Sequence, residues 1–125
     1  MITWLKQNRK VAFVLTFLMA IEIFHFSTLP GDPLSVGGSV WISRAYHFIA
    51  FFLFTFFLFI LMNSKEKIKL EQVLLILIIA SFYAITDEIH QIFTPFRDCT
   101  FEDFMTDLAG INFAILLHLF IKNKT

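Results

Sequence analysis

Residues 73–91 read VLLILIIASFYAITDEIHQ, an apolar run that ends in four polar residues within five positions. A helix needs about 20 predominantly apolar residues to cross the hydrocarbon core of a bilayer. Residues 73–93 meet this length, so we expect a membrane-spanning helix. Its last turn would carry Asp87, Glu88, His90 and Gln91.

Three further segments of similar character predict three more spans, at residues 11–29, 45–62 and 104–121. Hydrophobic residues make up 58% of the 125-residue chain and charged residues only 16%, whereas soluble domains carry about a quarter charged residues. The spans use almost the whole chain. The sequence therefore predicts an all-α, four-helix transmembrane bundle, formed by a single membrane domain over residues 1–125.

Charge and cysteine content exclude several classes of protein. The formal net charge is zero and the basic residues do not gather in one patch, so nucleic-acid binding is not expected. The single cysteine, Cys99, excludes an intrachain disulfide and a Cys-rich zinc site, and we interpret it as an ordinary loop residue. The first span follows basic residues, as in a signal peptide, but no small-x-small cleavage site follows it, which favours a retained span.

The basic residues also predict the orientation of the bundle. Eight of the ten Lys and Arg residues lie before the first span, between the second and third spans, or after the fourth. The other two connections hold only Arg44 and Arg97. Because cytoplasmic loops are enriched in Lys and Arg, we expect both termini in the cytoplasm of a multi-pass cell-membrane protein.

The ionisable residues of the spans lie near their outer ends. A charged residue deep in a membrane span costs on the order of 3 kcal/mol, so its presence indicates function by default. The spans carry, in turn, Glu22 and His25, Arg44 and His47, the polar end of residues 87–91, and Asp103 and Asp107. Residues three or four positions apart share a helix face. We expect these polar stripes to converge on a pocket open to the outer surface, with Gly110 and Ala109 allowing close helix approach.

Simpler roles stay open for several of these residues. Glu22 and His25 are candidates for a structural pair, Arg44 for an interface anchor and Asp103 for a helix cap. His118 is interpreted as an isolated packing residue. The phenylalanine-rich second span is interpreted as the bulky lining of a lipid-facing helix.

Five short motifs follow one another in a fixed order. They are Ser-x-x-Pro at 27–30, Arg-x-x-His-Phe at 44–48, DEIHQ at 87–91, Pro-x-Arg at 95–97 and Asp-x-x-x-Asp-x-x-Gly at 103–110. In order and spacing, from residue 27 onward, they resemble the VanZ-like family of small membrane proteins. The chain departs from the family pattern at Ser43 (usually Asp), Phe51 (Tyr), Phe96 (Gly) and Asp107 (Asn). A Phe at position 96 makes a positive φ costly, so we expect a loop of different shape there.

The resemblance implies a polytopic membrane protein related to resistance against teicoplanin-type glycopeptides. We expect an outer pocket that acts on a lipid-linked or cell-wall-related molecule. The candidate catalytic residues, suited to proton transfer, are His47, Asp87, Glu88 and His90. The candidate substrate-binding residues are Arg44, Gln91, Arg97, Asp103 and Asp107, of which the two arginines suit a phosphate or carboxylate.

The metal and any other cofactor stay open at this point. Nitrogen and oxygen donors suited to zinc, manganese or a harder cation are present in His47, Asp87, Glu88, His90, Asp103 and Asp107. DEIHQ, however, lacks the His-x-x-x-His spacing of a helical zinc site.

An alternative from another class is a non-enzymatic accessory or binding protein whose polar residues hold the helix bundle together. Its expected partners are membrane lipids, and its oligomeric state is open. An ion pathway is disfavoured, because the inner half of the spans is almost bare of ionisable groups.

Overall fold

The computed structural model describes residues 1–31, 39–63, 68–97 and 99–123. Within these ranges the regular structure is entirely helical and consists of α1 (Ile2–Gln7), α2 (Arg9–Thr28), α3 (Ser39–Met62), α4 (Leu70–Ile92) and α5 (Phe101–Asn123). The last four helices are long and apolar enough to cross a membrane, which confirms the predicted all-α, four-span fold. The short helix α1 was not predicted. The largest difference in bounds is at α3, which begins at Ser39 instead of residue 45, so that Arg44 and His47 lie beyond its first turn.

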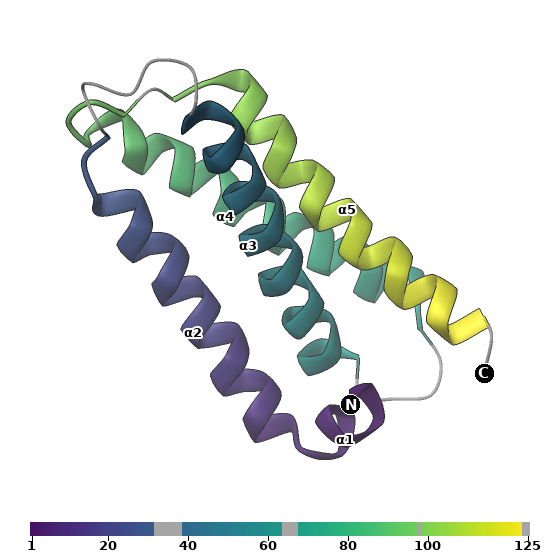
Figure 1. The fold of residues 1–125 in the computed structure, drawn as a ribbon. Coiled ribbons are helices and arrows are strands. Elements are labelled where there is room, and N and C mark those ends of the chain that lie inside the picture. Colours follow the sequence, from purple (N-terminus) through teal and green to yellow (C-terminus); the bar gives the residue numbers. More distant parts are fainter. Residues whose placement is uncertain (32–38, 64–67, 98, 124–125) are drawn as a thin grey trace.

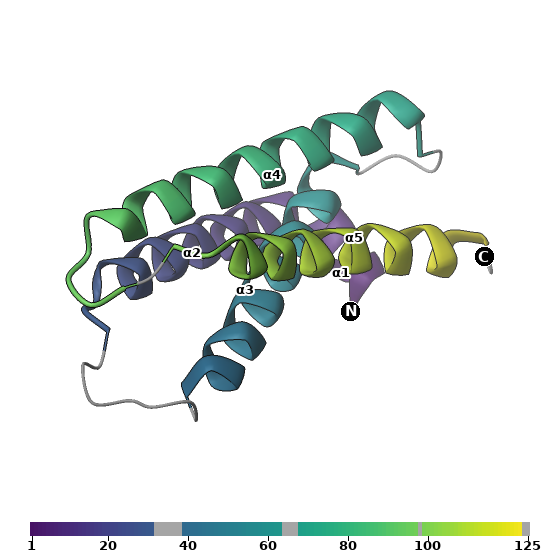
Figure 2. The same ribbon diagram turned by 90° about the horizontal axis from the view of Figure 1, so that it is seen from above.

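The four long helices run alternately in opposite directions. The ends of α2 and α4 and the starts of α3 and α5 gather at one end of the bundle, and both chain termini lie at the other end with α1 (Figure 1). We call these the site end and the terminal end. Figure 2 shows that α3 is inclined to the other three long helices. The two termini thus lie on one side, as predicted from the loop charges, while the assignment of that side to the cytoplasm stays a prediction.

Helix α3 forms the centre of the bundle. It contacts α5 most extensively and also packs on α2 and α4. Half of the most apolar stretch of α3 is buried inside the bundle, compared with 22% of the corresponding stretch of α2. Several of its phenylalanines form the core, among them Phe51, Phe54 and Phe59. The interpretation of this span as a lipid-facing helix was therefore wrong, because burial against three neighbours uses the same bulky residues that would suit lipid.

Gly110 allows the close contact between α3 and α5. A Cβ atom at this position would overlap the Phe48 carbonyl oxygen and would lie 3.1 Å from the Phe52 backbone nitrogen. The predicted role of Gly110 in close helix approach is confirmed. Ala109, by contrast, is exposed and takes no part in this contact.

Candidate functional site

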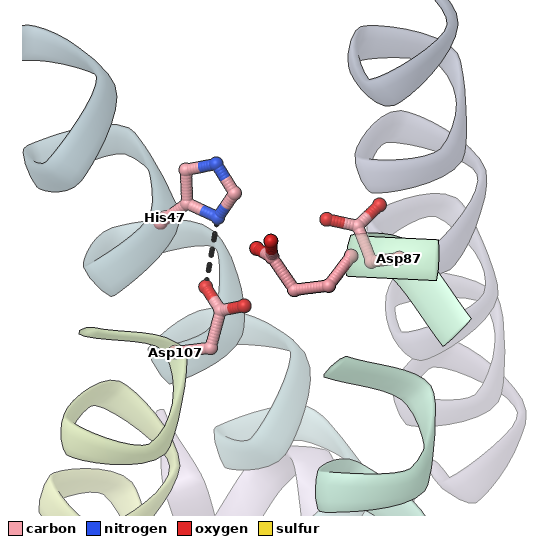
Figure 3. A group of neighbouring side chains, drawn as sticks. His47, Asp87 and Asp107 are labelled. Carbon is pink, nitrogen blue, oxygen red and sulfur yellow. Dashed lines mark hydrogen bonds and ion pairs between the residues drawn. The ribbon is translucent and has the colours of Figure 1, made fainter. Parts of the chain in front are cut away.

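Four ionisable side chains from three helices meet toward the site end. They are His47 of α3, Asp87 and Glu88 of α4, and Asp107 of α5, and all four are buried. One possible ligand atom from each residue lies within 4.8 Å of those of the others. His47, Asp87 and Asp107 approach one another from different helices (Figure 3). We call these four residues the carboxylate-histidine cluster.

The helix faces that pack together bring the cluster about. On α4 the buried residues at helical spacing are Ala80, Ala84, Asp87 and Gln91, so one face changes from small and apolar to polar along its length. On α5 the buried face runs from Asp107 through Gly110 and Ala114 to His118. Both faces turn toward α3, whose own buried face begins with His47 and continues with Ala50 and Phe54. On each of the three helices, the buried face is mostly apolar and carries its cluster residue toward the site end.

Hydrogen bonds satisfy only part of the cluster. His47 Nδ1 and Asp107 Oδ1 are 2.8 Å apart and join α3 to α5. Gln91 Nε2 donates to Asp87 Oδ2 at 2.9 Å. Both carboxylate oxygens of Glu88 and Oδ2 of Asp107 are buried and make no hydrogen bond of normal geometry to a described residue, although the Cys99 thiol lies beside Glu88. An unsatisfied buried polar group costs about 1–3 kcal/mol, so the cluster has acceptor capacity that the described chain does not fill.

His90 and Asp103, also predicted as site residues, lie outside the cluster. The His90 ring packs against Phe24 of α2, with ring centroids 4.7 Å apart. Asp103 lies in the first turn of α5, where Thr100 Oγ1 donates to Asp103 Oδ2 at 2.8 Å and accepts from the Asp103 N–H at 3.2 Å. Thr100 therefore caps the start of α5, and the Asp103 carboxylate binds the Thr100 hydroxyl instead of a backbone N–H group, so the capping role considered for Asp103 is filled by Thr100.

The two arginines of the site end face other partners. The Arg44 guanidinium lies 5.4 Å from the centre of the Trp41 ring, and Arg44 borders a pocket of about 600 Å³ between α3 and α5. Arg97 donates through Nη2 to the carbonyl oxygen of Phe26 at 2.8 Å and through Nε to that of Leu29 at 3.1 Å. Within the described residues, the one ion pair of the cluster is that of His47 with Asp107.

The loop after α4 holds the end of α2. Besides the two bonds from Arg97, Thr94 Oγ1 donates to the carbonyl of Ser27 at 3.0 Å, and the Gly31 N–H donates to the carbonyl of Pro95 at 3.0 Å. The Ser-x-x-Pro and Pro-x-Arg motifs therefore dock on each other. Sequence reasoning missed this contact, because backbone acceptors leave no signal in the sequence.

Phe96 occupies the turn of this loop with a φ of 58°, in the left-handed region that glycine favours. We expected Phe to change the shape of the loop by avoiding this region, and that expectation was wrong. The flanking hydrogen bonds, from the Gly31 N–H to the Pro95 carbonyl and from the Arg97 N–H to the Thr94 carbonyl, hold the turn in spite of the cost.

Helix α2 contributes no ionisable side chain to the cluster. Glu22 and His25 are both exposed, and the structure gives no ion pair between them. The structural pair considered for them is not formed. Polar stripes from α3, α4 and α5 converge as expected, whereas that of α2 faces outward.

A second pocket, of about 280 Å³, reaches Glu88 from the side of α4 and α5. Its lining includes apolar side chains of both helices, and Cys99 and Thr100 at the start of α5. Desolvation of the thiol beside the pocket and the neighbouring Glu88 carboxylate raise the pKa of Cys99 to about 11, although the residue as a whole is exposed. Cys99 is thus a free, exposed loop residue, as expected, and also borders the pocket.

The sequence matches one known protein family over nearly its whole length. The profile of the VanZ/LLP1 family matches residues 2–122, nearly the whole chain. The chain belongs to the VanZ/LLP1 family. This membership confirms the resemblance seen in the motifs, and with the four candidate spans it makes the chain a VanZ-family membrane protein of multi-pass type. No curated protein and no solved structure was found to match.

Proposed function

We propose that this VanZ/LLP1 protein binds the polar headgroup of a lipid-linked cell-envelope molecule and performs acid–base chemistry on it at the carboxylate-histidine cluster. The observation that supports the proposal is the joint burial of four ionisable side chains within spanning helices. Such groups are expensive in a membrane and mark functional sites there. The link with glycopeptide resistance follows the family name and belongs to the proposal.

The contacts of the cluster suggest a role for each residue. Asp107 would orient the His47 imidazole through the bond to Nδ1, as a carboxylate does for a histidine that transfers protons. Gln91 would hold Asp87 in place. Glu88 borders the pocket and has no hydrogen-bond partner among the described residues, so it is the group best placed to exchange a proton with a ligand.

The two pockets suggest how a lipid would lie. Phe101 lines both of them, so the pocket at Glu88 and the pocket at Arg44 are neighbours around the start of α5. An anionic group of the headgroup would lie at the Arg44 guanidinium, which suits a phosphate or carboxylate. Ile85, Ile89 and Phe104 would contact the chain of the lipid.

We place the site end on the extracytoplasmic side. The basic residues Lys6, Arg9, Lys10, Lys69 and Lys122 lie on segments at the terminal end, and this bias favours a cytoplasmic position for that end. In a Cys99→Ser background, a membrane-impermeant thiol reagent should label Trp41→Cys in intact cells. Glu71→Cys should react only after permeabilisation, and the reverse pattern would overturn the orientation.

A purely structural role has one observation in its favour. The hydrogen bond between His47 and Asp107 joins α3 and α5 and would stabilise the bundle. Glu88 is not explained in this way, because its carboxylate is buried without a hydrogen bond to another described residue. The chemical role and the structural role therefore differ most in the effect that they predict for a substitution of Glu88.

The deciding experiment compares Asp87→Asn and Glu88→Gln with the control Glu71→Gln, an exposed residue in the first turn of the same helix. Each variant would be expressed in a deletion strain and tested for complementation. The readouts are teicoplanin susceptibility and the pool of lipid-linked cell-wall precursors. We expect loss of complementation by the two cluster variants at normal protein levels in the membrane. Full complementation by both would overturn the proposal, and a reduced amount of folded protein would support the structural role.

A further inference from the structure

We propose that the carboxylate-histidine cluster binds one divalent cation of the Mn²⁺ or Zn²⁺ class, which deepens and rests on the proposed function. His47 offers an imidazole nitrogen, and Asp87, Glu88 and Asp107 offer carboxylate oxygens, all within 4.8 Å of one another. Carboxylates alone suit magnesium or calcium, whereas an added imidazole favours manganese, zinc and related first-row ions.

Unfilled acceptor atoms point independently to a bound cation. The Glu88 side chain is 5% exposed, and neither carboxylate oxygen makes a hydrogen bond of normal geometry to a described residue. The neighbouring Cys99 thiol is at most a weak donor to it. Asp107 is 0% exposed, and its Oδ2 likewise has no hydrogen-bond partner among the described residues. Buried polar atoms almost always have partners. One cation among these atoms would supply the missing partner to both side chains.

The described part of the chain offers no side-chain cation for this purpose. Arg97 binds the carbonyl groups at the end of α2, and Arg44 lies over Trp41. The one ion pair found at the cluster joins His47 to Asp107 and leaves two further carboxylates. Three carboxylates facing one imidazole therefore attract positive charge from outside the chain.

The spacing of the donor atoms fits a single ion with little movement. His47 Nδ1 and Asp107 Oδ1 are 2.8 Å apart, close to the separation of about 3 Å between adjacent ligands of one ion with bonds of about 2.1 Å. The ion would replace the proton of this hydrogen bond, and both residues would then be its ligands. Ligands on opposite sides of such an ion lie up to about 4.2 Å apart. The span of 4.8 Å needs only a small closure, which carboxylate rotations can supply without a shift of the helices.

A cation at this position would lie next to Glu88 and hence beside the pocket between α4 and α5. It would polarise an oxygen of a phosphate or carboxylate that enters there. The four donor residues would hold the ion, and the apolar lining of the pocket would hold the rest of the ligand.

The test uses the full chain, purified in detergent, stripped with EDTA and titrated with MnCl₂ or ZnCl₂. Bound metal is measured by mass spectrometry after desalting, and thermal unfolding is followed in parallel. We expect about one ion per chain and a metal-dependent rise in Tm. Glu88→Gln should weaken binding by about tenfold or more, whereas Glu71→Gln should bind like the wild type. Binding by the wild type no stronger than by an Asp87→Asn/Glu88→Gln double variant would overturn the proposal.

A measurement on the wild type alone decides the matter where a variant fails to fold. Manganese bound at the cluster has the His47 nitrogen as a ligand, so pulsed EPR should detect a nitrogen coupling to Mn²⁺. Bound manganese without that coupling would overturn the assignment. If Glu88→Gln fails to complement and the wild type binds no metal, the cation proposal is wrong. The proposed headgroup function would still be supported.

Discussion

Two histidines of the interface between α3 and α5 differ only in their neighbours. His47 and His118 are 3% and 4% exposed and lie toward opposite ends of the bundle. His118 Nε2 donates to the Phe56 carbonyl oxygen at 3.1 Å, and its ring stacks on Phe59 with centroids 4.4 Å apart. His47 meets Asp107 and two more carboxylates.

The comparison teaches that burial alone does not indicate function. His118 has one carbonyl acceptor and two aromatic neighbours, and these contacts match the predicted packing role. The neighbours of His47 include buried oxygens that no described residue binds. Buried polar atoms without a partner among the described residues also occur at the terminal end, in the amide of Asn63. What distinguishes the cluster is that its unfilled oxygens belong to ionisable carboxylates.

The largest effect is expected from replacing each histidine by phenylalanine. His47→Phe leaves Asp107 buried without its partner, which should cost about 3–5 kcal/mol of unfolding free energy. His118→Phe keeps the ring packing and loses one hydrogen bond, at a cost of about 1 kcal/mol. Unfolding in mixed micelles of increasing SDS content measures both. Equal costs would show that the two sites are alike after all.

A second comparison uses two arginines that bind carbonyl groups at opposite ends. Arg97 makes two such bonds, to Phe26 and Leu29, whereas Arg9 makes one, to Leu61 at 3.1 Å. Because these groups are exposed, Arg97→Gln should cost about 1–2 kcal/mol and Arg9→Gln about half as much. The same unfolding assay applies, and a larger cost at Arg9 would contradict the view that the loop after α4 holds α2.

The turn at Phe96 should allow a small gain in stability. Phe96→Gly removes the strain of a positive φ and should stabilise the protein by about 0.5–1 kcal/mol after the entropy of the unfolded glycine is included. Phe93 in the same loop has a φ of −89°, so Phe93→Gly should destabilise it. Thermal unfolding of both variants gives the sign, and a destabilised Phe96→Gly protein would refute the argument.

The smallest effect concerns the reactivity of Cys99. Its pKa is raised to about 11 by desolvation beside the pocket and by Glu88, so alkylation by iodoacetamide should stay slow at pH 8.5 and rise toward pH 11. Glu88→Gln removes a negative neighbour and stabilises the thiolate, which should lower the midpoint and speed alkylation at pH 8.5. Glu71→Gln should leave the profile unchanged. A midpoint near 8.5 in the wild type would contradict the predicted contact.

The fold was predictable because its cause is local. Each span needs only an apolar run of sufficient length, and all four runs are visible in the sequence. The spacing of Asp87 and Gln91, or of Asp107 and Gly110, likewise shows which residues share a helix face. Convergence of three such faces followed, since a polar face is costly in lipid.

The remaining site residues depend on which neighbour each face meets. Helical spacing placed Glu22 beside His25 but did not show that this face of α2 turns outward. Arg97 binds main-chain carbonyls, which are present at every position and give no pattern. The Asp103 carboxylate binds the Thr100 hydroxyl at the start of its own helix, and the sequence does not distinguish this contact from a ligand role.

The attachment of α2 has a consequence for how the gene can change. Thr94 and Arg97 bind the carbonyl groups of Ser27, Phe26 and Leu29, and a carbonyl group is the same in every amino acid. The cluster itself takes its side chains from α3, α4 and α5. Substitutions at the exposed positions of α2 that keep it helical and apolar therefore leave these hydrogen bonds intact, whereas buried positions such as Ala12 and Ile23 stay constrained by packing. The codons for the exposed positions are free to diverge while the codons for the cluster stay fixed.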